Sequence, residues 1–206
     1  MREYLMEFIG AFFLTLAIAL TGNPFAAGIM LMIMVYLGGH ISGGHYNPAV
    51  TLSVWMRGKL AGEKVAKYML SQLVGAFAAA ALYFAYAGKT FFPNPNASVG
   101  IWGALVIEML FTLVLCMTVL TFATTRRFAG NPLYGLAIGF SLLVGAFAGG
   151  PLSGGAFNPA VGLGPIIFDI ILGGASANFI ALYLFGPFLG GALAAVLFKV
   201  LNPKER

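Results

Sequence analysis

Apolar residues in this chain gather in long runs that short polar or glycine-rich segments separate. A membrane helix needs about 20 apolar residues, or somewhat fewer where the flanking residues adapt. Six runs meet this length, at about 4–21, 25–39, 65–87, 99–123, 132–150 and 177–201. Two further apolar pieces, 48–56 and 159–168, are too short to cross, and each begins at the proline of an Asn-Pro pair. The pattern predicts an all-α membrane protein with six transmembrane helices and two re-entrant half-helices.

The composition agrees with this pattern. Hydrophobic residues make up 60% of the 206 residues and charged residues only 8%, whereas a soluble domain carries about 25% charged residues. A chain of this length could not bury so much apolar surface in one core. Cytosolic enzymes, disordered segments and disulfide-stapled secreted domains are therefore excluded. The single cysteine, Cys116, lies inside an apolar run and is interpreted as a small core residue, and we expect neither a cofactor nor a bound metal.

An internal repeat organises the chain. Residues 42–52 match residues 153–163 at eight of eleven positions, and Glu7 and Glu108 stand at equivalent places before them. We expect one domain, 1–206, with repeats at approximately 1–88 and 98–201. Each repeat holds three spans, so the second must enter the membrane in the opposite orientation. This inverted repeat is the plan of many channels and transporters.

The positive charges predict the orientation. A net charge of +5 could suggest a nucleic-acid partner, but the basic residues punctuate the apolar runs, so we expect no nucleic acid. If the N-terminus is cytoplasmic, ten of the eleven cations lie on the cytoplasmic side and only Lys89 lies outside, as the positive-inside rule requires. Both termini are then cytoplasmic. The ten are Arg2, Arg57, Lys59, Lys64, Lys67, Arg126, Arg127, Lys199, Lys204 and Arg206.

Each Asn-Pro pair has a local structural cause. Asparagine is a good N-cap, and proline suits the first helical position because its missing N–H would be unpaired there. The preceding glycines permit backbone that other residues avoid. A half-helix of about ten residues is about 15 Å long, half of a bilayer core. Two such helices that enter from opposite faces would meet near the midplane.

These segments resemble the two signature loops of the aquaporin family, the major intrinsic proteins. The resemblance rests on residues 39–51, Gly-His-Ile-Ser-Gly-Gly-His-Tyr-Asn-Pro-Ala-Val-Thr, and on residues 157–160, Phe-Asn-Pro-Ala. It implies an hourglass fold, a pore through each subunit and a homotetramer. It also implies that the pore is lined at its centre by Asn47, Pro48, Ala49, Asn158, Pro159 and Ala160.

The resemblance assigns two further sets of residues. Glu7 and Glu108 would support the loops by accepting hydrogen bonds from loop N–H groups. Two helix N-termini at the midplane would present positive partial charge and disfavour cations. Acceptors along the path, either backbone carbonyls or side chains, would come from Gly43, Gly44, His45, Gly154, Gly155 and Ala156.

One position departs from the family. Most members carry Arg directly after the second Asn-Pro-Ala, where this chain has Val161. Counting from the motifs places the selectivity filter at Ala27, Ala146, Gly155 and Val161. A slip of one residue would substitute Gly145 or Phe147 for Ala146, or Ala26 or Gly28 for Ala27. Small uncharged residues at these positions predict a wide, apolar constriction.

The leading hypothesis is a passive channel in a bacterial inner membrane. It would pass water and small neutral solutes such as glycerol, urea or metalloid hydroxides, for example arsenite, which similar bacterial channels with this Arg-to-Val change handle. The first alternative is a water-selective aquaporin. A coupled secondary transporter is more remote because it needs ion-binding groups at the midplane, where only Asn47 and Asn158 are expected. We expect no enzyme, since no paired nucleophile, base or metal is visible.

Overall fold

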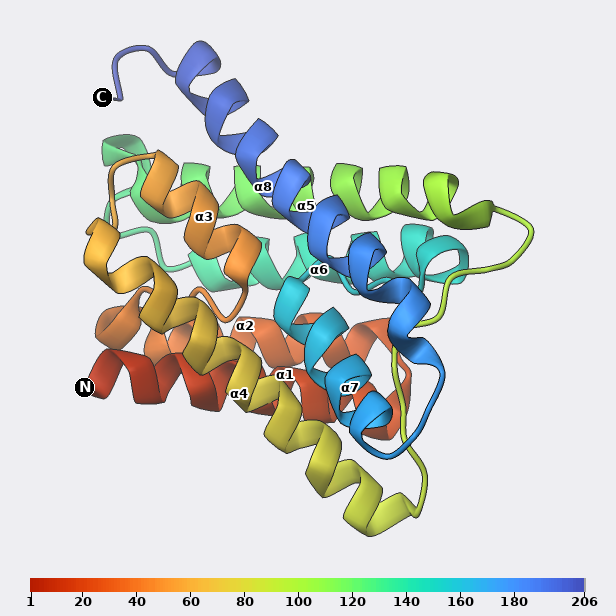
Figure 1. Ribbon diagram of the computed structural model, residues 1–206. Helices are drawn as coiled ribbons and strands as arrows, with labels where there is room; N and C mark the ends of the chain where they lie inside the picture. Colours follow the sequence, from red (N-terminus) through yellow and green to blue (C-terminus); the bar gives the residue numbers. More distant parts are fainter. Residues whose placement is uncertain (206) are drawn as a thin grey trace.

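The computed structural model describes residues 1–205, and within this range it is helical without a β-strand. Six of its helices are long and apolar enough to cross a membrane, which confirms the predicted fold class. They pack side by side (Figure 1). Their bounds are α1 Arg2–Thr21, α2 Pro24–Ser42, α4 Gly62–Ala87, α5 Gly100–Thr124, α6 Tyr134–Ser153 and α8 Ile180–Leu201.

Two shorter helices complete the fold. The helix α3 spans Pro48–Met56 and α7 spans Pro159–Ile171. Both begin inside the molecule and run outward in opposite directions (Figure 1). The 3₁₀ turns η1, Arg126–Phe128, and η2, Ser176–Phe179, lie in the connections.

The helix boundaries differ from the expected ones by three residues or fewer. The largest consequence is at α2 and α6, which run on to Ser42 and Ser153 and not only to 39 and 150. Each helix ends where the next glycine is left-handed, with φ of 92° at Gly43 and 90° at Gly154. The expected ends were wrong because glycine and proline within the last turns did not terminate these helices.

The chain ends define two faces. Both termini lie on one side of the molecule (Figure 1), and we call this side, with the connections 57–61 and 125–133, the termini face. The opposite face holds the connections 22–23, 88–99 and 172–175; residues 88–99 are called the strap. Of the ten cations expected on one side, nine lie in helix ends or connections at the termini face, and Arg206 lies outside the described residues. Lys89 lies in the strap.

Glycines let the long helices approach closely. A Cβ atom at Gly28 of α2 would lie 2.7 Å from the carbonyl oxygen of Gly139 in α6. A Cβ atom at Gly75 of α4 would collide with the carbonyl of Phe8 in α1. Small residues at such crossings are typical of membrane helices, where close van der Waals packing drives association. The long helices thereby enclose the two half-helices.

Candidate functional site

The two half-helices begin with equivalent caps. The side-chain oxygen of Asn47 accepts from the N–H of Ala49 at 2.8 Å, and that of Asn158 accepts from the N–H of Ala160 at 2.9 Å. Pro48 and Pro159 occupy the first helical position. Each asparagine therefore satisfies a free N–H of the first turn, as an N-cap does.

The same asparagines bind each other's loops. Nδ2 of Asn47 donates to the carbonyl oxygen of Phe157 at 2.9 Å, and Nδ2 of Asn158 donates to the carbonyl oxygen of Tyr46 at 2.9 Å. Both side chains are nearly buried, yet both line the same small cavity. An amide nitrogen carries two hydrogens, so each asparagine keeps one N–H for a molecule in that cavity.

Glu7 fixes the loop that precedes α3. Its carboxylate accepts hydrogen bonds from Ser42 Oγ at 2.6 Å, from the backbone N–H of His45 at 3.0 Å and from that of Tyr46 at 2.6 Å. Gln72 Nε2 of α4 donates to the same carboxylate at 2.7 Å. Every partner is a donor, so this buried carboxylate acts only as an acceptor and orients the loop.

Glu108 makes the matching set of contacts in the second half. Ser153 Oγ donates to it at 2.7 Å, and the backbone N–H groups of Ala156 and Phe157 donate at 3.0 Å and 2.6 Å. The hydroxyl of Tyr183 donates to the carbonyl of Ser153 at 2.7 Å. The two loops are thus held by the same kind of bonds at nearly the same distances.

The backbone of each loop is left-handed over several residues. Tyr46 has φ of 51° and Phe157 has φ of 46°, although neither is a glycine. Such a conformation costs about 1–3 kcal/mol for a non-glycine residue. The bonds to Glu7 and Glu108 offset this cost, because they gather successive N–H groups on one carboxylate.

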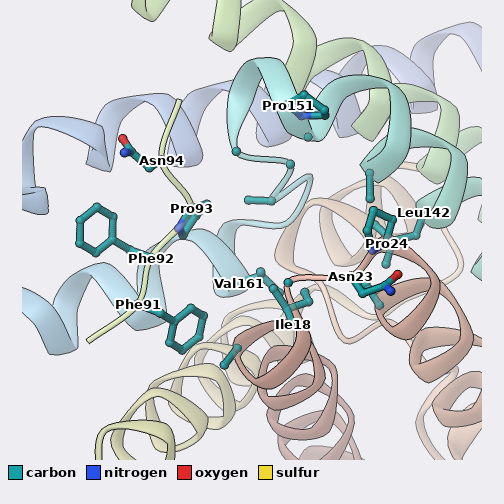
Figure 2. A pocket seen from close by; sticks show the side chains of 18 of the residues that line it. Ile18, Asn23, Pro24, Phe91, Phe92, Pro93, Asn94, Leu142, Pro151 and Val161 are labelled. Carbon is teal, nitrogen blue, oxygen red and sulfur yellow. The ribbon is translucent and has the colours of Figure 1, made fainter. Parts of the chain in front are cut away.

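A cavity of about 610 Å³ opens on the opposite face. Figure 2 shows residues 91–94 of the strap on one side of it and the turn of Asn23 and Pro24 on the other, with Val161 between them. All four residues expected in the filter, Ala27, Ala146, Gly155 and Val161, line this cavity. Phe147 also lines it, whereas Gly145, Ala26 and Gly28 do not line it.

A second cavity lies at the centre and holds about 10 Å³, close to the space that one water molecule needs. Asn47 and Asn158 contribute its polar groups, with Gly44 and His45 beside them. The remaining lining is mostly aliphatic. It comprises Leu14, Ile18, Leu31, Val50, Leu115, Val119, Ile138, Leu142, Ala156 and Val161.

A third cavity, of about 790 Å³, opens on the termini face. His40, Gly43, His45, Lys59 and Arg126 are among its lining residues. Because His45 and Val119 line both this cavity and the central one, they mark the junction between them. The three cavities therefore follow one another from face to face.

The junction on the opposite side is entirely apolar. Four residues line both the central cavity and the cavity of the opposite face: Ile18, Leu142, Ala156 and Val161. We call these four the throat. Only Val161 was expected in the filter; Ile18 and Leu142 come from spans α1 and α6, whose apolar periodicity gives no sign of which face lines a cavity.

Several contributing residues were missed from the sequence. Tyr68 and Tyr183, whose hydroxyls donate to the carbonyls of Ser42 and Ser153, align in the internal repeat, so that signal was available. Thr51 and Gln72 gave no signal, because the corresponding repeat positions hold residues without a polar side chain, Gly162 and Pro187. Among residues 1–205, no three His, Cys, Asp or Glu side chains are grouped so that they could hold a metal ion.

Comparison with known proteins gives consistent findings. Residues 1–198 match the family model described as Major intrinsic protein. The chain is 31% identical to the aquaporin AqpM of Methanothermobacter thermautotrophicus, over 98% of this chain and 97% of that relative. It is 30% identical to the glycerol uptake facilitator protein-like 6 of Lactiplantibacillus plantarum, over 100% of each chain.

A solved structure has the same fold. The X-ray structure of the aquaglyceroporin from Plasmodium falciparum superposes with a TM-score of 0.82, over 99% of this chain and 98% of that chain. The two sequences are 22% identical, so this likeness concerns the arrangement of helices alone.

Proposed function

Because this chain belongs to the major intrinsic protein family, whose members are passive channels and not enzymes, we propose that it conducts water together with larger uncharged solutes. Glycerol, urea and metalloid hydroxides such as arsenite are the solutes that we expect. The observation that carries this proposal is the lining of the opposite-face cavity. Ala27, Ala146, Gly155 and Val161 all line it, and none of these four is charged or aromatic, although Phe91, Phe92 and Phe147 also line the cavity.

The centre of the path supports passage of neutral molecules and rejection of cations. Both half-helices point their N-termini there, and these carry positive partial charge. Asn47 and Asn158 each hold one N–H available to a solute oxygen. With valine at position 161, the exclusion of cations rests on these central groups. A hydroxyl compound can accept from them, whereas a cation is repelled.

We further propose the arrangement in the membrane. The halves 1–88 and 98–201 are inverted repeats, which the matched contacts of Glu7 and Glu108 support. The termini face is cytoplasmic, because it carries the excess of cations while Lys89 lies opposite. Family resemblance supports a homotetramer, and a bacterial inner membrane is the location that we propose for it. In a Cys116→Ser background, an impermeant thiol reagent added to intact cells should label Lys89→Cys and spare Lys204→Cys; the reverse would invert the orientation.

The size of the central cavity favours a second candidate, a water-selective channel. A space of about 10 Å³ holds about one water molecule. Glycerol or arsenous acid needs the aliphatic side chains of the throat and the central cavity to move apart. The two candidates therefore differ in whether the throat widens for a larger solute.

Reconstituted vesicles decide between them. Purified protein in liposomes should speed shrinkage in a sucrose gradient, which reports water, and should speed reswelling in glycerol, urea or arsenite gradients. Empty liposomes give the background for each solute. Fast water flux with glycerol, urea and arsenite at background would establish the water-selective channel and end the wide-filter proposal.

A further inference from the structure

The ring of His45 stands at the junction of the central cavity and the termini-face cavity. Its Nδ1 lies 3.1 Å from the hydroxyl of Thr51. Its Nε2 has no hydrogen-bond partner among the described residues. The fully buried polar atoms that lack a partner belong to Thr15, Arg57, Gln72 and Thr112. Since Nε2 of His45 lacks a partner but is not one of them, it is not fully buried. The Nε2 atom therefore faces the open path.

The hydroxyl of Thr51 has three neighbours. Besides His45 Nδ1, it lies 3.1 Å from the carbonyl oxygen of Asn47 and 2.9 Å from Nε2 of Gln72. The orientation of the Gln72 amide follows from its other contact, because Nε2 also donates to Glu7 at 2.7 Å. A reversed amide would place its oxygen against the carboxylate. Gln72 must therefore donate to Thr51.

Counting hydrogens assigns the remaining roles. A hydroxyl has one hydrogen and two lone pairs. The Asn47 carbonyl can only accept, so Thr51 gives its one hydrogen there, in the backbone contact common for threonine in helices. One lone pair of the Thr51 oxygen accepts the hydrogen bond from Gln72 Nε2, and the other can accept one from His45 Nδ1. Nδ1 of His45 therefore carries the hydrogen. The opposite assignment would set two lone pairs against each other at the Asn47 carbonyl.

The second half shows that these side chains are not needed to hold a loop. In the sequence repeat, His45, Thr51 and Gln72 correspond to Ala156, Gly162 and Pro187. The loop around Ala156 nevertheless has the same left-handed backbone and the same bonds to its glutamate. The polar chain through Gln72 and Thr51 is therefore additional to loop support, and it ends on His45.

We propose that Thr51 and Gln72 are positioning residues that hold His45 as the neutral tautomer with its hydrogen on Nδ1. Nε2 is then an unprotonated acceptor in the path. A solute oxygen can accept a hydrogen bond from the amide of Asn47 or Asn158. The same solute can then donate a hydroxyl or amide hydrogen to Nε2 of His45. The use of this acceptor by solutes rests on the proposed channel function, whereas the tautomer itself does not depend on it.

Nitrogen NMR tests the tautomer directly. The chain has only two histidines, so ¹⁵N-histidine-labelled protein in lipid gives a simple spectrum, and a His40→Gln variant assigns the His45 signals. At a pH where His45 is neutral, we expect the hydrogen on Nδ1 and a bare Nε2. A hydrogen on Nε2 in the unmodified chain would overturn the proposal, whatever the variants do.

Two substitutions at one position provide the matched comparison. Thr51→Val removes the hydroxyl with little change in shape and should yield a mixture of both tautomers. Thr51→Ser keeps the hydroxyl and should restore the Nδ1–H form. A Thr51→Val spectrum identical to that of the unmodified chain would show that Thr51 does not set the tautomer and would overturn its role.

Flux measurements separate this inference from the proposed function. Glycerol flux relative to water should fall roughly 2- to 10-fold in Thr51→Val, the scale of one net hydrogen bond, and recover in Thr51→Ser. If the channel passes only water, the NMR result still stands and the proposed solute range alone fails. If glycerol passes and the ratio stays unchanged while the tautomer shifts, the acceptor role of Nε2 is wrong.

Discussion

Asn47 donates a hydrogen bond from its side-chain amide to the backbone carbonyl of Phe157, 2.9 Å away and 110 positions later in the chain. Asn158 returns the contact through the carbonyl of Tyr46. Each asparagine therefore caps its own half-helix and also binds the loop of the other half. This relationship makes the centre of the path sensitive to single-atom changes.

Replacing Asn47 by aspartate tests the donor apart from the cap. Aspartate still caps α3, but it loses the hydrogen that Phe157 accepts, and a buried carbonyl left unpaired costs about 1–3 kcal/mol. It also adds a negative charge at the centre, where one charge acting on another at 4 Å is worth about 4 kcal/mol at an effective dielectric of 20. We expect proton leak to rise at least about tenfold, measured with a pH-sensitive dye in vesicles.

The matched control is Asn96→Asp in the strap. Asn96 caps a turn by accepting from the N–H of Ser98 at 3.0 Å and is exposed on the opposite face. This variant should leak no more than the unmodified chain. Equal leak in both variants would mean that the central groups do not carry the exclusion of cations.

Val161→Arg tests the throat. The arginine would place a long cationic side chain where the central cavity and the opposite-face cavity meet. Glycerol permeability should fall at least about tenfold more than water permeability, since a barrier difference of 1.4 kcal/mol suffices for that ratio. Stopped-flow light scattering on vesicles measures both. Val161→Leu adds bulk without charge. If Val161→Leu lowers the ratio of glycerol to water permeability as much as Val161→Arg does, then side-chain volume alone sets the selectivity. An equal loss of water and glycerol permeability in Val161→Arg would contradict the filter assignment.

Glu7→Gln tests how much the loop depends on its carboxylate. Four donors face Glu7, two at each carboxylate oxygen, so the amide nitrogen of glutamine would oppose two of them. Loss of these two bonds to a charged acceptor, at about 1.5–3 kcal/mol each, predicts a stability loss of about 3 kcal/mol or more. Thermal unfolding in detergent measures it. Glu63→Gln, at an exposed position in the first turn of α4, should change little, and similar losses in both variants would refute the supporting role of Glu7.

The strap is tied down at its start. Thr90 Oγ1 donates to Asp169 Oδ1 at 2.6 Å, and Oδ2 of the same carboxylate accepts from the N–H of Ser176 at 3.3 Å. Thr90→Val removes a bond to a charged acceptor, worth about 1.5–3 kcal/mol. Trypsin should then cleave after Lys89 about tenfold faster or more in detergent solution. Ser98→Ala removes only a contact within the strap, so cleavage as fast as in Thr90→Val would show that Asp169 is not the anchor.

The sequence predicted the elements well because each element follows from local chemistry. Run length predicted the spans, and an asparagine followed by proline predicted the half-helix starts at Pro48 and Pro159 to the residue. Contacts between elements were harder to predict. Ile18 and Leu142 line the throat, yet nothing distinguishes them from lipid-facing residues of the same spans, since both environments are apolar. Membrane helices therefore hide their lining positions from hydropathy arguments.

The paired bonds of Asn47 and Asn158 form late during synthesis of the chain, because each joins the first half to the second. The partner of Asn47 emerges 110 residues later, and at about 5–20 residues per second this interval is roughly 5–20 s. During that time α3 and its polar loop lie beside the first helices, and the side-chain amide of Asn47 lacks its acceptor, the carbonyl of Phe157. These central bonds form only after the loop before α7 has been made, so a chain that ends before residue 157 lacks both of them.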